Sequence, residues 1–200
     1  RSAIELQPDH ISAYGLSYED GAPLSRDLAA GLIEAVDEDT DPAMFELTID
    51  GLARAGIDQY EISNFARAGF ECRHNLNYWA NGSYAGIGPD AASYLHGTRS
   101  SNFADIDKYV RAVTSGESTV ESSETLSDLE RVCETATLNL RRRRGIDLAQ
   151  FKSQTGYDAL QLFAELIRKY RKLDLIEKNS GRISLTRQAL GIANSILCDF

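Results

Sequence analysis

Long apolar runs are missing from this 200-residue sequence. None approaches the roughly 20 consecutive apolar residues of a membrane-spanning helix, so the sequence predicts no membrane span. Cysteine is also scarce, with Cys72, Cys133 and Cys198 standing far apart along the chain. Such spacing argues against a disulfide framework and against a local cysteine metal site.

Basic residues are outnumbered: 21 Lys and Arg face 30 Asp and Glu, for a net charge of −9. This balance argues against a protein that binds nucleic acid over its whole surface. The charge is unevenly spread, because residues 1–124 hold 8 basic and 21 acidic residues while residues 125–200 hold 13 and 9. The change falls in the serine-rich stretch 115–125, which is typical of a linker. We therefore expect two domains, residues 1–120 and 121–200.

The sequence has neither an initiator methionine nor a signal peptide at its start, which predicts a chain that begins within a fold. Strands are expected at residues 10–18 and 57–62, and a further short strand at 84–89. Asp41-Pro42 opens a helix between the first two, and Gly56 ends it. Strand–helix–strand order predicts an α/β fold with parallel pairing.

Residues 121–200 predict three helices, a β-hairpin and a last helix. Ser127 and Glu130 form a capping-box pattern at the first helix, and Asp147 caps the second. The hairpin turns at residues 179–181, and Thr186 caps the last helix. This order predicts a small winged-helix-like α+β domain.

Side chains suited to ligand binding concentrate between residues 58 and 96. His74 offers a ring nitrogen to a metal or a proton, and Asn75 can orient that ring. Tyr78 and Trp79 offer broad faces to a planar ligand. Taken singly, such a histidine is more often a satisfied polar residue, and a lone tryptophan is more often a packing anchor.

Two further pairs are candidates. Glu61 and Asn64 stand at the end of an expected strand, where the sites of parallel α/β folds form. A structural hydrogen-bonding role for Glu61 is an equal alternative, since no partner carboxylate stands at an obvious spacing. Gly86 and Gly88 give a tight backbone that can approach a ligand, but the third glycine and helix start of a dinucleotide fingerprint are missing.

Taken together, these segments resemble the radical-SAM family of oxygen-independent coproporphyrinogen III oxidase-like proteins. The resemblance rests on residues 8–24 and 59–67, and on His74-Asn-Leu-Asn-Tyr-Trp79, which matches the His-Asn-x-x-Tyr-Trp motif of the heme-chaperone branch. Residues 86–94 match the block that follows that motif, and residues 121–200 look like the small C-terminal domain of the family. The matches are collinear over essentially the whole chain.

The resemblance implies the C-terminal part of a partial, TIM-like radical-SAM barrel, followed by the small winged-helix-like domain. Family members hold a [4Fe–4S] cluster on a Cys-x-x-x-Cys-x-x-Cys motif and bind S-adenosylmethionine (S-adenosyl-L-methionine). That motif is not in this sequence, and three thiolates so widely spaced do not match it. We therefore expect the earlier barrel strands, and with them the cluster ligands, to be missing from this chain.

The resemblance also implies roles for the candidate residues. It implies heme binding by His74, Asn75, Tyr78 and Trp79, with His74 as candidate axial ligand of the iron. It places Glu61, Asn64, Gly86 and Gly88 at the barrel interior, near S-adenosylmethionine or the substrate. Related sequences often carry a second histidine within residues 88–94, and its absence here argues against a bis-histidine site.

Three functional hypotheses follow. The first is a fragment of a cytoplasmic heme chaperone that passes heme to acceptor proteins, which the motif at residues 74–79 favours. The second is a fragment of an oxygen-independent coproporphyrinogen III oxidase, an enzyme of radical decarboxylation in porphyrin biosynthesis. The third is nucleic-acid binding through Arg141–Arg144. That run lies near the end of a helix, whereas a reading helix presents its contacts along one face, so no nucleic-acid partner is expected.

Overall fold

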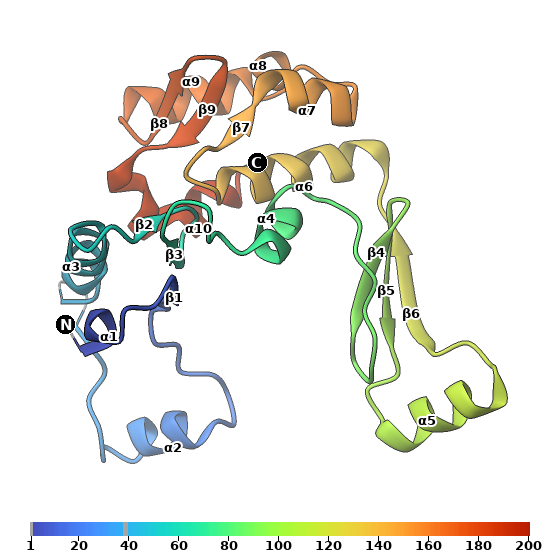
Figure 1. Cartoon of the computed structure of the whole chain (residues 1–200). Coiled ribbons are helices and arrows are strands. Elements are labelled where there is room, and N and C mark those ends of the chain that lie inside the picture. Colours follow the sequence, from blue (N-terminus) through green and yellow to red (C-terminus); the bar gives the residue numbers. More distant parts are fainter. Residues whose placement is uncertain (1, 38–39) are drawn as a thin grey trace. The chain divides into compact units, whose positions relative to one another are not determined.

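The structure is a computed structural model that describes residues 2–37 and 40–200 (Figure 1). Its helices and strands form two compact units, residues 1–72 and 73–200, called here the N-terminal and the C-terminal unit. The N-terminal unit comprises α1 (Ser2–Glu5), β1 (His10–Ser12), α2 (Pro23–Ala29), α3 (Thr40–Ala53), β2 (Asp58–Gln59) and β3 (Asn64–Ala66).

The sheet of the N-terminal unit has the strand order β1-β3-β2, and both pairings are antiparallel. The parallel pairing expected from the sequence is therefore wrong for these strands. The pairing was expected between residues 10–18 and 57–62, but β3 lies between β1 and β2 and pairs with both of them. A tight turn joins β2 to β3, closed by the amide of Tyr60, which donates to the carbonyl of Asn64 at 3.1 Å, and so short a connection allows only antiparallel pairing.

The predicted helix is confirmed as α3, which has Asp41 in its first turn. Gly56 follows it with a φ of 73°, a left-handed conformation that glycine adopts at no steric cost. The inner end of α3 buries Ile49 and Leu52, whereas Met44 and Leu47 are 54% and 69% exposed. Only the second half of the helix thus contributes to the core of this unit.

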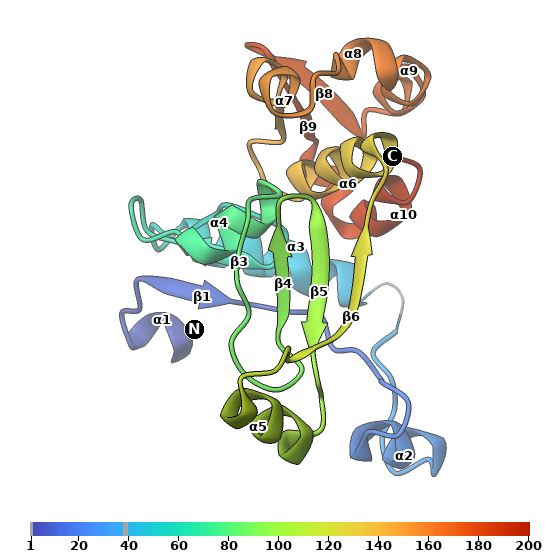
Figure 2. The same ribbon diagram turned by 90° about the vertical axis from the view of Figure 1, so that its right-hand side faces the viewer.

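The C-terminal unit begins with α4 (Arg73–Trp79) and an antiparallel meander of β4 (Ala92–Leu95), β5 (Thr98–Asn102) and β6 (Val120–Thr125). Helix α5 (Ile106–Ser115) lies at one end of this sheet (Figure 2). His96 and Gly97, with φ of 52° and 82°, join β4 to β5 in the left-handed conformations of a tight hairpin. Of the strand expected at 84–89, only a bridge between Tyr84 and Tyr94 is formed.

The serine-rich stretch expected as a linker is in part a strand, and this corrects the sequence interpretation. Its last six residues form β6, and hydroxyl pairs join it to β5: Thr98 with Thr125 at 2.9 Å and Ser101 with Ser122 at 2.7 Å. The compact units divide between residues 72 and 73. A boundary between family domains at residue 120 stays a prediction.

From α6 onward the structure follows the predicted winged-helix-like order. The elements are α6 (Asp128–Leu140), β7 (Ile146–Asp147), α7 (Leu148–Thr155), α8 (Ala159–Leu162), α9 (Ala164–Lys172), β8 (Ile176–Asn179), β9 (Arg182–Leu185), the 3-10 helix η1 (Arg187–Ile192) and α10 (Ala193–Leu197). The capping box of Ser127 and Glu130, the cap of α7 by Asp147 and the hairpin are all confirmed. Thr186 is the N-cap residue of η1, as predicted, but its hydroxyl donates to the carbonyl of Asp174 at 2.7 Å and makes no capping hydrogen bond.

A well-buried apolar core lies within this module. Its fully buried side chains include Val132, Leu140, Ile146, Phe151 and Ile183. The third predicted helix is divided at Phe163, whose ring packs 5.1 Å from that of Phe200. Across the residues that the structure describes, no helix has the length and apolar character needed to cross a membrane.

Candidate functional site

Helix α4 carries all four residues of the predicted heme motif. His74 and Tyr78 stand four residues apart, so they share one face of the helix. Their rings meet edge to face, with centroids 4.6 Å apart and planes at 83°. The side chain of His74 is exposed, and its role as a ligand stays a prediction.

A row of aromatic rings continues from α4 toward β4. Tyr78 lies 4.2 Å from Tyr84, and Tyr84 lies 6.4 Å from Tyr94, between ring centroids. Burial raises the pKa of the Tyr84 phenol, and the neighbouring Tyr78 and Glu134 raise it further against the opposing effect of Arg99. Tyr84 is therefore a neutral phenol at physiological pH.

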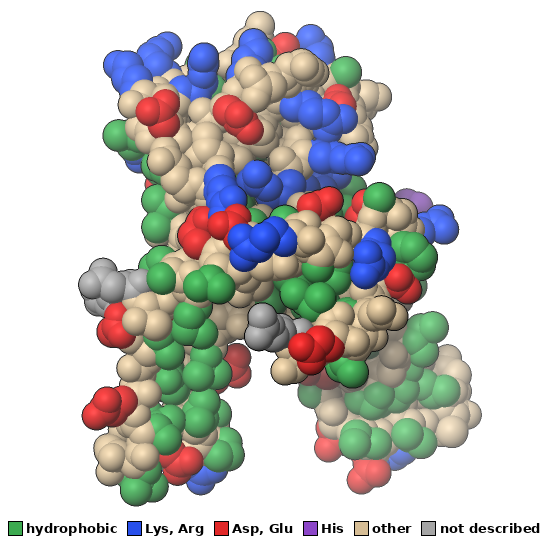
Figure 3. All heavy atoms as spheres, turned by 60° about the vertical axis from the view of Figure 1, so that its left-hand side comes forward, with side chains coloured by type: hydrophobic (Ala, Val, Ile, Leu, Met, Phe, Trp, Pro, Cys, Tyr) green, Lys and Arg blue, Asp and Glu red, His purple; other side chains and the backbone are tan. Residues whose placement is uncertain are grey.

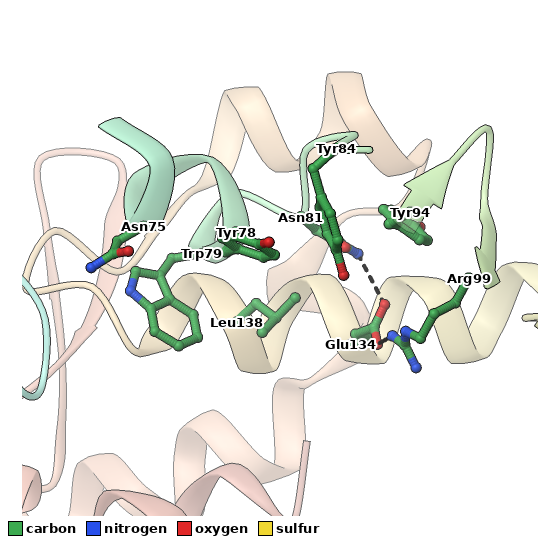
Figure 4. Close-up of a pocket in the computed structure, with 9 residues that line it drawn as sticks. All are labelled: Asn75, Tyr78, Trp79, Asn81, Tyr84, Tyr94, Arg99, Glu134 and Leu138. Carbon is green, nitrogen blue, oxygen red and sulfur yellow. Dashed lines mark hydrogen bonds and ion pairs between the residues drawn. The ribbon is translucent and has the colours of Figure 1, made fainter. Parts of the chain in front are cut away.

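These rings border a pocket of about 240 Å³ within the C-terminal unit (Figure 4). This volume is below the roughly 300–1,000 Å³ of typical small-molecule pockets, so a large planar ligand cannot be enclosed there. Trp79 and Leu138 form an apolar wall, and Asn75 stands beside the indole at the same end. A macrocycle would have to lie across the mouth of the pocket and over α4.

The opposite end of the pocket is polar. Arg99 forms ion pairs with Glu134 of α6 and with Glu124 of β6, the latter at 2.8 Å. Burial lowers the pKa of Arg99, but the hydrogen bonds and charges of the two glutamates outweigh it and raise that pKa overall. Asn81 donates to Thr135 Oγ1 at 3.0 Å and to Glu134 Oε2 at 3.3 Å. The charge of Arg99 is thus already balanced.

Trp79 has the packing role that was weighed for it from the sequence. Its ring lines the pocket, and the guanidinium of Arg141 lies over it, 4.9 Å from the ring centroid. Its indole nitrogen is buried and has no hydrogen-bond partner among the described residues. The side chain is therefore a packing anchor that retains an unused donor.

Glu61 and Asn64 belong to the N-terminal unit, where they lie together as predicted. They are only 1% and 3% exposed. The side-chain amide of Asn64 donates to Glu61 Oε1, and the amide of Ser63 reaches the same oxygen at 3.2 Å. Ser12 donates its hydroxyl to Asn64 Oδ1, which the sequence reasoning did not anticipate. This arrangement supports the structural hydrogen-bonding role that was left open for Glu61.

The backbone amides of Gly86 and Gly88 both donate hydrogen bonds to side chains of the same unit. The amide of Gly86 donates to Ser93 Oγ at 2.9 Å, and a Cβ at this position would lie 2.2 Å from the carbonyl oxygen of Ala92. Gly88 has a φ of 114°, and its amide donates to the hydroxyl of Tyr109 at 3.1 Å. Close packing thus explains the glycine at position 86, and the positive φ explains the glycine at position 88. A role of either glycine toward a ligand stays a prediction.

The described residues do not suit an iron–sulfur cluster. Throughout residues 2–37 and 40–200, no three His, Cys, Asp or Glu side chains gather as metal ligands. Cys72, Cys133 and Cys198 are all free thiols. A cluster needs converging thiolates, so its ligands would have to come from elsewhere.

Sequence reasoning missed the residues that complete the pocket. Arg99 and Glu134 come from β5 and α6, and no local motif links them to α4. Leu138 has an ordinary helical position in α6. Only the tertiary fold brings these side chains to the motif.

Comparison with known proteins agrees with the resemblance. Residues 126–191 match the family described as HemN C-terminal domain. The chain is 31% identical to the heme chaperone HemW of Lactococcus lactis over 98% of this chain and 52% of that protein. It is 33% identical to HemW of Mycobacterium tuberculosis over 95% of this chain and 50% of that protein. The chain thus spans about half the length of these relatives.

A solved structure shows the same fold. The coproporphyrinogen III oxidase HemN from Escherichia coli, described as a radical-SAM enzyme, matches with a TM-score of 0.73 and 16% identity. The match covers 98% of this chain and 49% of that one. The mixed α/β chain is thus related, over nearly its whole length, to the C-terminal part of the radical-SAM family that contains HemW and oxygen-independent coproporphyrinogen III oxidase.

Proposed function

We propose that this chain is the heme-handling part of a radical-SAM heme chaperone, which binds heme at α4 and passes it to acceptor proteins. The observation that carries the proposal is the exposed imidazole of His74 beside the aromatic row that starts at Tyr78. An axial base, aromatic surface and an apolar wall are the elements that a heme site requires. The name of the HemW relatives supports the same reading.

In this proposal His74 holds the iron, and Tyr78 and Trp79 contact the macrocycle. Asn75 lines the same pocket and stands next to the ligand in sequence, where it can orient the bound group. Because the pocket is small and His74 is exposed, the heme is held at the surface. A surface site suits a carrier, since an acceptor must reach the heme to take it.

The oxidase alternative is not favoured. The HemW relatives cover nearly the whole chain at about a third identity, whereas the oxidase structure shares 16% identity and supports the fold alone. For the complete protein we also propose that Glu61, Asn64, Gly86 and Gly88 lie near S-adenosylmethionine or the substrate, and that the protein acts in the cytoplasm. The [4Fe–4S] cluster would then belong to the half of the relatives that this chain does not span.

A titration of heme into the purified protein tests the proposal. We expect His74→Ala to abolish the spectrum of a histidine-bound heme and to weaken binding at least tenfold, equivalent to about 1.4 kcal/mol. The matched control is His96→Asn, which removes another exposed histidine while keeping a residue that tolerates its turn. Equal spectra and affinities for the wild type and His74→Ala would remove His74 as the ligand.

A further inference from the structure

One ring contact orients the imidazole of His74. Its ring meets that of Tyr78 edge to face, with centroids 4.6 Å apart and planes at 83°. Charged side chains are numerous on the face of the molecule drawn in Figure 3, yet within residues 2–37 and 40–200 none forms a hydrogen bond or an ion pair with the imidazole. The direction in which His74 points therefore depends on Tyr78.

Tyr78 is in turn held by packing and not by a hydrogen bond. Its hydroxyl has no hydrogen-bond partner in the part of the chain that the structure describes, and its ring centroid lies 4.2 Å from that of Tyr84. Both rings border the pocket of about 240 Å³, so there is open space beside them (Figure 4). Without the ring of Tyr84, the ring of Tyr78 would have room to turn into this space.

Tyr84 has little freedom to move, because its backbone is paired with β4. The amide of Tyr84 donates to the carbonyl of Tyr94 at 2.9 Å, and the amide of Tyr94 donates to the carbonyl of Tyr84 at 2.9 Å. Tyr94 is only 6% exposed, and its ring centroid lies 6.4 Å from that of Tyr84. A buried strand residue thus holds Tyr84 in place.

The loop between α4 and Tyr84 is also fixed. Asn77 Nδ2 donates to the carbonyl of Ser83 at 3.0 Å, and the amide of Gly82 donates to the carbonyl of Asn77 at 2.9 Å. A Cβ at Gly82 would lie 2.2 Å from Asn77 Oδ1, so the loop passes very close to the helix. This closure turns the chain back on α4 and brings Tyr84 against Tyr78.

We propose that Tyr84 is a positioning residue, which fixes the direction of the His74 imidazole through Tyr78 for the ligand that binds at α4. This inference rests on the proposed function and adds to it a residue outside the motif at residues 74–79. A side chain that is already held in its binding orientation loses less conformational freedom when the ligand arrives, so binding is tighter. Tyr84 acts through the ring of Tyr78, and its hydroxyl is not needed for this role.

Proton NMR of the histidine imidazoles, recorded without heme, tests the positioning directly. The chain has three histidines, and His74→Ala identifies the signals of His74. In the wild type, the ring of Tyr78 should displace these signals from the positions of free histidine, whereas the exposed His96 has no ring neighbour among the described residues and should not show such a displacement. We expect Tyr84→Leu to move the His74 signals toward the free positions and Tyr84→Phe to restore them.

Heme titration measures the consequence for binding. We expect Tyr84→Leu to weaken heme binding about two- to fivefold, and Tyr84→Phe to bind as the wild type does. The matched control is Tyr109→Leu, which removes another half-buried tyrosine of the same unit, outside the aromatic row. It should change neither the His74 signals nor the affinity for heme.

The two measurements separate this inference from the proposed function. Signals of His74 at the free-histidine positions in the wild type would overturn the positioning role, even if Tyr84→Leu did not fold. Unchanged His74 signals, or unchanged heme affinity, in a folded Tyr84→Leu would also overturn it, while leaving the heme proposal intact. A wild type that binds no heme would instead refute the proposed function, and with it the ligand for which Tyr84 positions His74.

Discussion

The imidazole of His74 meets the ring of Tyr78 edge to face at 4.6 Å, and Tyr78 in turn lies 4.2 Å from Tyr84. The exposed imidazole of His74 thus packs against a row of aromatic rings, which restricts its rotation. Aromatic pairs of this kind contribute about 0.5–1.5 kcal/mol beyond the area they bury. The contribution of Tyr78 to heme binding can therefore be measured separately from that of His74.

We expect Tyr78→Leu to weaken heme binding by roughly two- to tenfold while the histidine-bound spectrum persists. The loss arises because His74 and the macrocycle both lose an aromatic neighbour. Titration of heme into wild type, Tyr78→Leu and Tyr78→Phe measures it, and Tyr78→Phe should stay near wild type. The control Tyr157→Leu, at another exposed tyrosine, should bind heme as the wild type does. If Tyr78→Leu binds heme as tightly as this control, Tyr78 does not contribute to binding.

We expect Asn64→Ala to destabilise the protein by about 1–3 kcal/mol, because the buried carboxylate of Glu61 loses a donor. Urea denaturation measures the change. The matched control is Asn179→Ala, which removes another asparagine that donates to a glutamate, here Glu177 at 2.9 Å, but at an exposed position. A difference of less than about 0.5 kcal/mol between the two variants would contradict a structural role for this hydrogen bond.

Gly86→Ala should destabilise the loop before β4. The added Cβ would lie 2.2 Å from the carbonyl oxygen of Ala92, so the backbone must move, at a cost of about 1–3 kcal/mol. Gly191→Ala is the control, since a Cβ there meets no atom within 4 Å. Thermal melting of both variants checks the expectation, and equal melting temperatures would refute it.

The hydrogen bonds of Asp199, near the end of the chain, predict that the stability of the fold depends on pH. Asp199 Oδ2 accepts hydrogen bonds at 2.6 Å from both Lys169 Nζ and the hydroxyl of Tyr170. These bonds, that of Lys169 foremost, lower the pKa of the Asp199 carboxyl below its ordinary value. A lowered pKa in the folded state means that the carboxylate stabilises the fold above its unfolded pKa, and that this stabilisation is lost as pH falls through the folded pKa.

We therefore expect Asp199→Asn to melt at a lower temperature than the wild type at neutral pH. The gap should narrow as pH falls below about 4, the ordinary pKa of aspartate, because the wild type then loses the same interaction. Melting curves across this range measure it. A gap that stays constant down to the lowest pH would show that the charge of Asp199 does not contribute.

The features best predicted from the sequence are those that depend on residues close together along the chain. The capping box at Ser127, the aspartate cap at Asp147 and the hairpin turn at residues 179–181 each depend on neighbours within four residues, and all three formed. Strand β6 was missed because it is polar and exposed on both faces, which leaves no apolar alternation to detect.

The candidate site was predictable only in part. The motif on α4 was recognisable because its residues are contiguous, and the helix places them together. Arg99, Glu134 and Arg141 join them from later elements, and no spacing in the sequence encodes that approach. The antiparallel pairing of β1 with β3 was missed for the same reason, since strand order alone did not reveal the direction of pairing.

Arg99 ties two elements together, because it holds Glu124 of β6 and Glu134 of α6 at once. The meander and the first helix of the winged-helix-like module therefore cannot slide past each other without breaking an ion pair. Both pairs are partly exposed, so added salt screens them. These two ion pairs hold the polar end of the pocket together, so the shape of the pocket depends on ionic strength.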